Sequence, residues 1–252
     1  MSCAILVVLS GGQDSTTCLA QVLSTKDAST PVECVTFDYG QRHRHEIVAA
    51  RRVRAVAEER FDIKIPHHDI TLPGVLVGTS PLVAHTTPVD RYDSAATLPG
   101  GLEKTFVPMR NALFLTVAAN RAVEMAIRTQ KDEAIIVTGV SQEDYGGYPD
   151  CRETFIRSIE HAFKMSLDDP GLPKVSIWTP LCYKNKQQTV ELSESIEGAR
   201  EMLAWSHTCY NGFVTPCGQC HACLLREKGY AAAGVTDPLL LRLDLNIHWS
   251  AL

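Results

Sequence analysis

The fold is decided by residues 4–16, which read Ala-Ile-Leu-Val-Val-Leu-Ser-Gly-Gly-Gln-Asp-Ser-Thr. The apolar start predicts a buried strand, and Gly-Gly followed by Asp-Ser-Thr predicts a tight turn into the first residues of a helix. Such a turn presents backbone N–H groups and the positive end of a helix dipole, which together bind anions. A glycine turn without any ligand is the alternative. The sequence therefore predicts a phosphate-binding loop directly behind the first strand.

The same alternation continues along the chain. Apolar runs predict strands at residues 4–9, 32–37, 63–66, 134–138 and 175–178. Helical periodicity predicts helices over residues 16–23, 111–128 and 152–164, and one whose apolar face carries Ile47, Ala50, Val53 and Ala57. Strands that alternate with helices favour an α/β fold with a doubly wound, mostly parallel sheet. Ligands of such sheets bind beyond the carboxyl ends of the strands.

Two parts are predicted within the 252 residues, a length that suits one α/β domain with a small appendage. Residues 1–196 carry the alternating pattern and are expected to bind a nucleotide. Within them, residues 70–101 fit neither period and hold several prolines and glycines, which predicts a long loop or lid. Residues 197–252 change to short helices around a cysteine cluster. Their Leu-rich stretch, 238–245, suits either core packing or a dimer surface.

Composition and charge favour small-molecule partners. The net charge is −5, and no Lys/Arg block stands out beyond residues 51–54, which lie on a predicted helix. A surface that binds nucleic acid normally carries more positive charge. No apolar run is long enough to span a membrane, and the first residues do not form a signal peptide. We therefore expect a cytoplasmic protein with no direct nucleic-acid or membrane partner.

Four of the nine cysteines cluster near the C-terminus. Cys209, Cys217, Cys220 and Cys223 follow the pattern C-x7-C-x2-C-x2-C. Four thiolates at this spacing suit a tetrahedral soft-metal site, with Zn²⁺ as the first choice and an iron–sulfur cluster as the rival. The ferredoxin pattern continues with x3-C-P, whereas Glu-Lys stands at residues 227–228. Because thiolates fill all four positions, we expect one structural zinc ion per chain.

A specific resemblance joins these motifs. The stretches that carry it are residues 9–19, 35–43, 105–111, 146–152, 179–181 with Lys186, and 208–213. Over almost its full length the chain resembles the 7-cyano-7-deazaguanine synthase (QueC) family, whose Ser-Gly-Gly-x-Asp-Ser loop is that of ATP-pyrophosphatase-type (PP-loop) enzymes. The most particular motifs are Phe-Asp-Tyr-Gly-Gln-Arg-His and Tyr-Pro-Asp-Cys-Arg. The chain departs from the family at Gly146 and at Met109, and Met109 is expected to alter the packing behind Arg110.

The resemblance implies a Rossmann-like, adenine nucleotide alpha hydrolase-like fold and the activity of a C–N ligase. The implied reaction turns 7-carboxy-7-deazaguanine and ammonia into 7-cyano-7-deazaguanine, a precursor of queuosine. Two adenylations by Mg²⁺–ATP, first of the acid and then of the amide, release AMP and pyrophosphate. We also expect a homodimer, for which the Leu-rich stretch 238–245 is the candidate surface.

Nucleotide and catalytic residues follow from the loop and the resemblance. The residues expected to bind ATP are Leu9, Ser10, Gly11, Gly12, Gln13, Asp14, Ser15, Thr16, Thr36, Phe37, Arg42 and Gly139. Asp14 is also expected to hold Mg²⁺ against the phosphates. Arg110 opens a predicted helix, where a cation opposes the dipole unless an anion lies nearby. Arg110 is therefore a candidate cation for the developing phosphate charge, and the match at residues 179–181 with Lys186 implies Lys186 as another. Asp14 completes the candidate catalytic set.

A deazaguanine needs hydrogen-bond partners along its edge and a flat surface for stacking. The residues expected to supply them are Tyr39, Gln41, Tyr145, Tyr148, Asp150 and Arg152. Other functions stay open at this point. A tRNA thiolase shares the same loop but would use a persulfide cysteine and a basic surface. A non-catalytic zinc- or nucleotide-binding module, or a relative that installs a deazaguanine on DNA or protein, are further alternatives.

Overall fold

The first strand divides its side chains between two cores. In the computed structural model, which describes residues 2–98, 101–142, 148–245 and 247, β1 (Cys3–Val8) is the central strand of a sheet. Successive side chains of a strand point to opposite faces. Ala4 and Leu6 therefore enter one core, and Ile5 and Val7 enter the other. Such burial on both faces is typical of a parallel sheet covered by helices.

The sheet has five parallel strands in the order β3-β2-β1-β4-β5. The remaining strands are β2 (Val32–Asp38), β3 (His67–Thr71), β4 (Glu133–Val137) and β5 (Lys174–Trp178). The central strand pairs with both neighbours, since Ile5 is opposite Val32 on one side and Ile135 on the other. The chain thus winds outward from β1 in both directions, which confirms the predicted doubly wound sheet.

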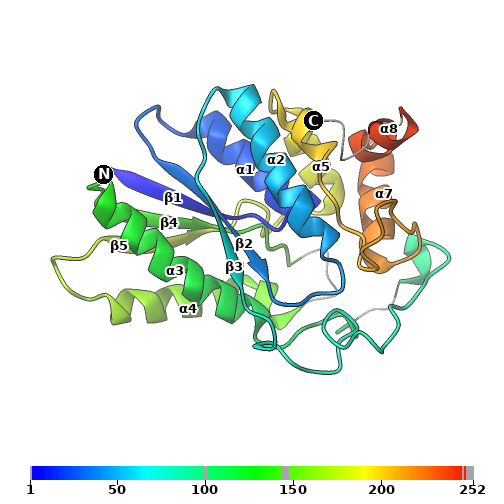
Figure 1. The fold of residues 1–252 in the computed structure, drawn as a ribbon, viewed down its shortest axis with the longest axis horizontal. Coiled ribbons are helices and arrows are strands. Elements are labelled where there is room, and N and C mark those ends of the chain that lie inside the picture. The colour runs from blue at the N-terminus through cyan, green and yellow to red at the C-terminus, as the bar shows by residue number, and fades with distance from the viewer. Residues whose placement is uncertain (1, 99–100, 143–147, 246, 248–252) are drawn as a thin grey trace.

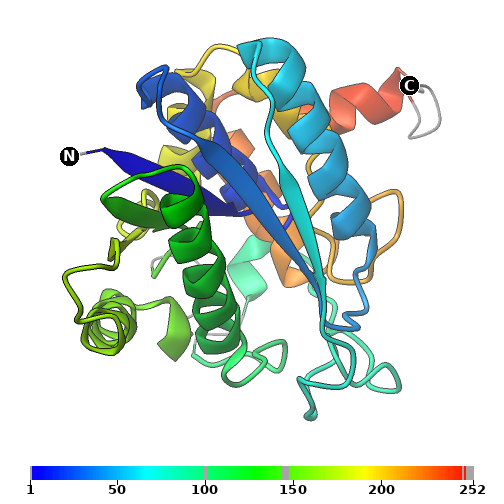
Figure 2. The same ribbon diagram turned by 60° about the vertical axis from the view of Figure 1, so that its left-hand side comes forward.

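Helices cover both faces of this sheet. α1 (Gln13–Thr25) and α2 (His45–Phe61) contribute to one core, and α3 (Arg110–Arg128) and α4 (Glu153–Ser166) to the other. Figures 1 and 2 show these two pairs on opposite sides of the strands. The order of strands and helices brings the loops that follow β1, β2 and β4 to one edge of the sheet.

The third strand lies elsewhere than the sequence indicated. The apolar residues Ile63 and Ile65 predicted a strand at 63–66, but β3 is the polar segment His67–Thr71. It is the edge strand and pairs with β2 alone, so its side chains are half-buried or exposed. An edge strand with one covered face does not need a continuous apolar run, and that is why the apolar pattern misplaced it.

The C-terminal part, residues 197–252, holds α6 (Ala199–Leu203), α7 (His221–Ala233) and α8 (Pro238–Asp244), and Figure 1 shows α7 and α8 at one end of the molecule. Its α6 packs on α1 and α2, and its α7 packs on α5 (Lys186–Glu194), the last helix of the preceding part. A Cβ atom on Gly229 of α7 would lie 2.8 Å from the Cβ atom of Lys186. This close approach fixes where α5 begins. Among the described residues, no helix is long and apolar enough to cross a membrane.

A long loop follows β3, as the sequence predicted. Residues 72–94 form neither helix nor strand, and the one-turn η1 (Ala95–Thr97) follows them. Arg42 holds the middle of this loop: its guanidinium donates to the carbonyl oxygens of Pro81, His85 and Thr87 at 2.6–2.9 Å. The loop is therefore fastened to the segment that follows β2.

Candidate active site and metal centre

A cavity of about 200 Å³ lies at the carboxyl ends of the strands. Its walls come from the ends of β1, β2 and β4, the start of α3 and residues 207–210. Many of the residues expected in the site line it, namely Leu9, Ser10, Gly12, Gln13, Asp14, Ser15, Phe37, Tyr39, Arg110, Gly139 and Tyr148. The structure thus brings the phosphate loop, one candidate catalytic cation and part of the expected substrate site into one space.

The loop behind β1 has the geometry of an anion site. Gly11 has a φ of +87°, and a Cβ atom there would lie 2.2 Å from the carbonyl oxygen of Glu46, so only glycine fits. The amide of Gly12 donates to Ser10 Oγ at 3.2 Å, and the Ser10 and Ser15 hydroxyls lie 3.0 Å apart. The loop runs directly into α1, whose first residues Gln13, Asp14 and Ser15 line the cavity. The first amides of a helix have no acceptor within the helix, so they are available to an anion.

Asp14 and Lys186 form a buried ion pair beside this loop. Lys186 Nζ lies 2.7 Å from both carboxylate oxygens of Asp14, and the two side chains are 7% and 13% exposed. The two residues are far apart in sequence and meet because α5 starts against α1. Lys186 itself does not line the cavity, but it neutralises a carboxylate that does. The contact with Asp14 places the ammonium group of Lys186 next to the loop behind β1.

Arg110 is the first residue of α3, as predicted, and it lines the cavity. Burial alone would lower the pKa of its guanidinium, but Tyr39, Tyr210 and Asp150 around it raise that pKa above its ordinary value. Burial raises the pKa of Tyr39 to about 12, so this phenol stays protonated. The preceding residue, Met109, has a φ of +63° and is 68% exposed, so its side chain does not itself pack behind Arg110.

The segment after β4 contributes through its second half. Tyr148 lines the cavity, and its hydroxyl lies 2.6 Å from Thr105 Oγ1. Asp150 does not line the cavity. Its carboxylate accepts the backbone N–H of Asn111 at 3.3 Å, and burial raises its pKa. Asp150 therefore holds the start of α3, beside Arg110.

Several residues expected in the site lie outside the cavity lining. They are Gly11, Thr16, Thr36, Gln41, Arg42, Asp150, Arg152 and Lys186. The Thr36 hydroxyl donates to the Leu9 carbonyl. The side chain of Gln41 accepts the Tyr39 N–H and donates to the Phe37 carbonyl, so the polar atoms of both residues serve the protein itself. Arg152 is exposed at the start of α4. Tyr145 lies outside the described residues, so its role stays a prediction.

Other residues line the cavity that the sequence did not single out. They include Glu46, Asn111, Phe114, Cys151, His207, Thr208 and Tyr210. Phe114 stacks on Phe37 with ring centroids 4.2 Å apart. The backbone N–H of His207 donates to the Gly11 carbonyl at 2.7 Å, which seats residues 207–210 over the phosphate loop. Only the motif at 208–213 signalled this segment in the sequence.

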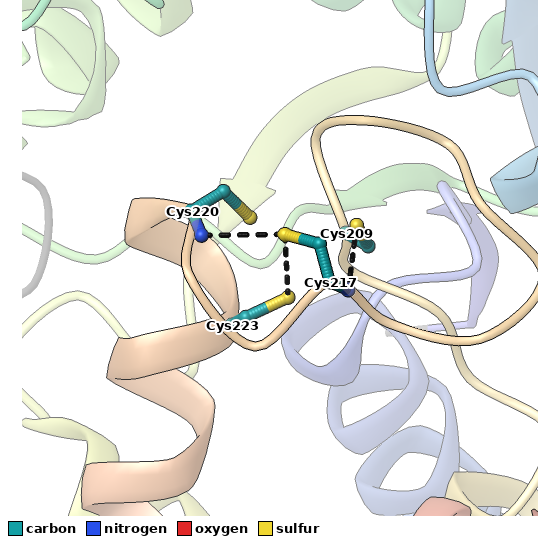
Figure 3. Close-up of side chains that lie close together, drawn as sticks. All are labelled: Cys209, Cys217, Cys220 and Cys223. Atoms are coloured by element: carbon teal, nitrogen blue, oxygen red, sulfur yellow. Dashed lines mark hydrogen bonds between the residues drawn. The ribbon is translucent and has the colours of Figure 1, made fainter. Parts of the chain in front are cut away.

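The cysteine cluster closes into a potential metal site. The sulfur atoms of Cys209, Cys217, Cys220 and Cys223 all lie within 4.8 Å of one another (Figure 3). The backbone N–H groups of Cys217 and Cys220 donate to the sulfurs of Cys209 and Cys217 at 3.4 and 3.3 Å. Hydrogen bonds from the thiols of Cys220 and Cys223 lower the pKa of Cys209. Four converging sulfurs with amide support fit a four-coordinate soft-metal ion.

The cluster is tied to the long loop and to the cavity. His221, next to Cys220, pairs with the buried carboxylate of Glu103. The same carboxylate accepts the Thr105 hydroxyl at 3.0 Å, and Thr105 in turn contacts Tyr148 in the cavity wall. A continuous row of polar contacts therefore runs from the cysteine cluster to the site.

Comparison with known proteins places the chain in a family. The model of "Queuosine biosynthesis protein QueC" matches residues 4–234. A 7-cyano-7-deazaguanine synthase from Chromobacterium violaceum is 48% identical over 237 residues, which cover 94% of this chain and 93% of that protein. The synthase from Laribacter hongkongensis is 46% identical, with 94% of each chain covered. The synthase from Gloeobacter violaceus is 45% identical, with 93% of this chain and 94% of that protein covered.

A solved structure also aligns, the U34-tRNA thiolase NcsA from Methanococcus maripaludis with its 4Fe–4S cluster. It has a TM-score of 0.39 and 15% sequence identity, and the alignment covers 96% of this chain and 67% of that chain. A likeness this weak carries no argument about chemistry. The family match over residues 4–234 and the identity to three synthases show that the chain belongs to the queuosine biosynthesis protein QueC family.

Proposed function

We propose that this protein is a C–N ligase that converts 7-carboxy-7-deazaguanine and ammonia into 7-cyano-7-deazaguanine at the expense of ATP. Membership of the QueC family supports this reaction. The observation that carries it is the shared cavity, in which the phosphate loop and Arg110 face the same space. A site of that kind can hold a triphosphate and a carboxylate next to each other.

The chemistry needs the carboxylate to be activated, because a carboxylate oxygen is not a leaving group at neutral pH. Attack of this oxygen on the α-phosphorus of ATP forms an acyl adenylate and releases pyrophosphate. Ammonia then displaces AMP and gives the amide. The amide oxygen attacks a second ATP in the same way, and loss of AMP with two protons leaves the nitrile. In both rounds, negative charge develops on phosphate oxygens.

The residues around the loop suit that charge. The amides of Gly12 and Gln13 and the hydroxyls of Ser10 and Ser15 would bind the departing pyrophosphate. Lys186, which is paired with Asp14, would stabilise the negative charge that develops on the phosphate oxygens. Asp14 would be the protein ligand of the Mg²⁺ that accompanies ATP, where the cation supplies charge neutralisation.

Substrate recognition is proposed for the wall opposite the phosphate loop. Arg110 is a fixed cation that would bind the substrate carboxylate, while Tyr39 and Tyr148 offer flat surfaces for the deazaguanine ring. Asp150 supports this wall because it holds the start of α3. The assignment of Asp150 and Arg152 to direct substrate contact stays a prediction.

The cysteine cluster is proposed to hold one structural zinc ion per chain. Its four sulfurs leave no position for a reacting ligand, which suits a closed site. The ion would stabilise residues 197–252 as a subdomain that packs on residues 1–196 and supports Lys186 through Gly229. A cytoplasmic location is part of the proposal, because a chain with nine cysteines, four of them clustered as metal ligands, suits a reducing compartment. A homodimer is proposed from the exposed side chains of Leu240, Leu241 and Leu245.

The test is an incubation of the purified protein with ATP, Mg²⁺, ammonium and 7-carboxy-7-deazaguanine, followed by mass spectrometry. The proposal expects the nitrile, AMP and pyrophosphate, each dependent on the acid. Asp14→Asn is expected to slow the release of pyrophosphate by about 10²-fold or more, because one electrostatic stabiliser is lost. Formation of ADP, or AMP release that does not require the acid, would contradict the proposal.

A further inference from the structure

An imidazole–carboxylate pair lines the cavity and has no assigned task. His43 Nε2 lies 3.2 Å from Glu46 Oε1, and both residues line the cavity wall beside Tyr39 and Tyr210. Their side chains are only 7% and 15% exposed. His43 follows β2, and Glu46 lies in the first turn of α2, so a helix start fixes the carboxylate.

The carboxylate of Glu46 differs from the enclosed acids that pair with a fixed cation, and unlike Glu103 and Asp150, which also lack a lysine or arginine partner in the described part of the chain, it lines the cavity. Asp14, Glu33 and Asp237 each pair with a lysine or an arginine. Among the described residues, Glu46 has no such partner within ion-pair distance, and its contacts are with His43 and the side-chain amide of Gln41 at 3.2 Å. A carboxylate left without a fixed cation in a ligand cavity is suited to a cation that arrives with the substrates.

The other nitrogen of the imidazole strengthens this view. When Nε2–H donates to Glu46, Nδ1 carries the lone pair. Nδ1 of His43 is buried and has no hydrogen-bond partner among the described residues. A buried acceptor without a partner costs stability unless a ligand uses it. A carboxylate 3.2 Å from Nε2 favours the tautomer with the proton on Nε2, which leaves Nδ1 as the base.

The surroundings suit a small cation. The rings of Tyr39 and Tyr210 lie 6.4 and 6.0 Å from the His43 ring, centroid to centroid, and aromatic rings stabilise cations near their faces. The turn of Glu46 also packs on the phosphate loop, because the Glu46 carbonyl approaches Gly11. An ammonium ion bound at the pair would therefore lie close to the phosphates of an adenylate.

We propose that His43, held by Glu46, binds ammonium and is the base that takes its proton before amide formation. The inference rests on the proposed function, in which an acyl adenylate reacts with ammonia. Nitrogen is present mainly as ammonium at neutral pH, and ammonium has no lone pair with which to attack. A base in the cavity removes this obstacle.

The step balances as follows. His43 Nδ1 accepts one proton from NH4⁺, and the lone pair of the resulting NH3 forms a bond to the acyl carbon of the adenylate. The bond from that carbon to the AMP oxygen breaks, and its electron pair stays on AMP. The nitrogen then loses one more proton, which the AMP phosphate accepts. The imidazolium, stabilised by the Glu46 carboxylate, returns its proton to water when the products leave.

Hydroxylamine separates this role from the others. It is mainly uncharged at neutral pH, so it attacks the adenylate without a base and gives a hydroxamate. For His43→Asn, the ammonium-dependent kcat/KM is expected to fall by about 10²–10⁴-fold, as for the loss of a general base, while hydroxamate formation falls far less. For Glu46→Gln, a loss of roughly tenfold or more is expected with ammonium, and again little with hydroxylamine.

Matched controls are Glu59→Gln on the same helix and the exposed His161→Gln on α4, neither of which lines the cavity. Both should match the unmodified protein with either nucleophile. Equal losses of kcat/KM with ammonium and with hydroxylamine would overturn the proposal and assign the His43–Glu46 pair to folding. A rise in the KM for ATP alone would also overturn it and assign the pair to nucleotide binding. If the unmodified protein made no hydroxamate from the acid and ATP, the proposed function itself would have failed instead.

Discussion

Gly139→Ala tests whether the site depends on the contact between the ends of β4 and the phosphate loop. A Cβ atom at Gly139 would lie 2.9 Å from the carbonyl carbon of Asp14 and 2.9 Å from the amide nitrogen of Ser15. Ordinary contact begins near 3.4 Å, so the loop has to move by about 0.5 Å. Both atoms belong to the backbone at the start of α1 and cannot rotate away.

Two quantities should change. Overpacking of this kind costs about 1–3 kcal/mol of unfolding free energy, or roughly 2–12 °C in melting temperature for a chain of this size. A shift of 1 Å in a catalytic group costs about 10²-fold in rate, so half of that shift predicts a loss of about tenfold in acid-dependent pyrophosphate release. The assays are calorimetry and a pyrophosphate-release assay at saturating substrates.

The matched control is Gly171→Ala, in the exposed turn before β5. There a Cβ atom would meet only the end of the Asp169 side chain, at 3.1 Å, and that side chain can rotate. This variant should keep the rate and the melting temperature of the unmodified protein. An active Gly139→Ala variant with an unchanged melting temperature would refute the close contact on which the loop geometry rests.

Three further predictions follow from other parts of the chain. Cys220→Ser should lower the metal content from one zinc ion per chain toward zero and should lower the melting temperature. The reason is that a structural zinc site contributes on the order of 10 kcal/mol of apparent binding energy. Elemental analysis measures the metal content, and iron with sulfide in the unmodified protein would contradict the prediction. Asp150→Ala should raise the KM for the carboxylated deazaguanine by roughly tenfold or more and that for ATP much less, and steady-state kinetics in which only the ATP constant moved would assign the segment to the nucleotide. Burial lowers the pKa of His67 to about 4, so between about pH 6.5 and 4 the unfolded chain binds more protons than the folded one. The free energy of unfolding therefore falls as the pH drops through that range, by up to about 1.4 kcal/mol per pH unit. In denaturant unfolding, His67→Gln should lose less unfolding free energy over that pH range than the unmodified protein. An identical pH dependence of the two proteins would disprove the contribution of His67.

The sequence predicted those features that depend on neighbouring residues. The phosphate loop and the first helix were predictable because strand, glycine turn and helix start follow one another within residues 4–16. The cysteine cluster was predictable for the same reason, since a short stretch sets the distances between its sulfurs. Arg110 was found as a helix start, and the structure confirms that position.

Features that depend on distant segments were not predictable in the same way. The pair of Lys186 with Asp14 needs α5 to start against α1, and no local pattern states this contact. Arg42 was expected at ATP, but the long loop supplies carbonyl oxygens that surround its guanidinium. Glu46 belongs to the site because α2 begins beside Gly11, which only the folded chain shows.

The central claim is that both oxygens of the substrate carboxylate leave on AMP. The direct measurement uses 7-carboxy-7-deazaguanine with ¹⁸O in both carboxyl positions, together with ATP, Mg²⁺ and ammonium, and determines the mass of the AMP. Because each adenylation bonds one substrate oxygen to the α-phosphorus, the account predicts two AMP molecules per nitrile, each with one ¹⁸O atom. AMP without label, or label that appears in water or in orthophosphate, would contradict it.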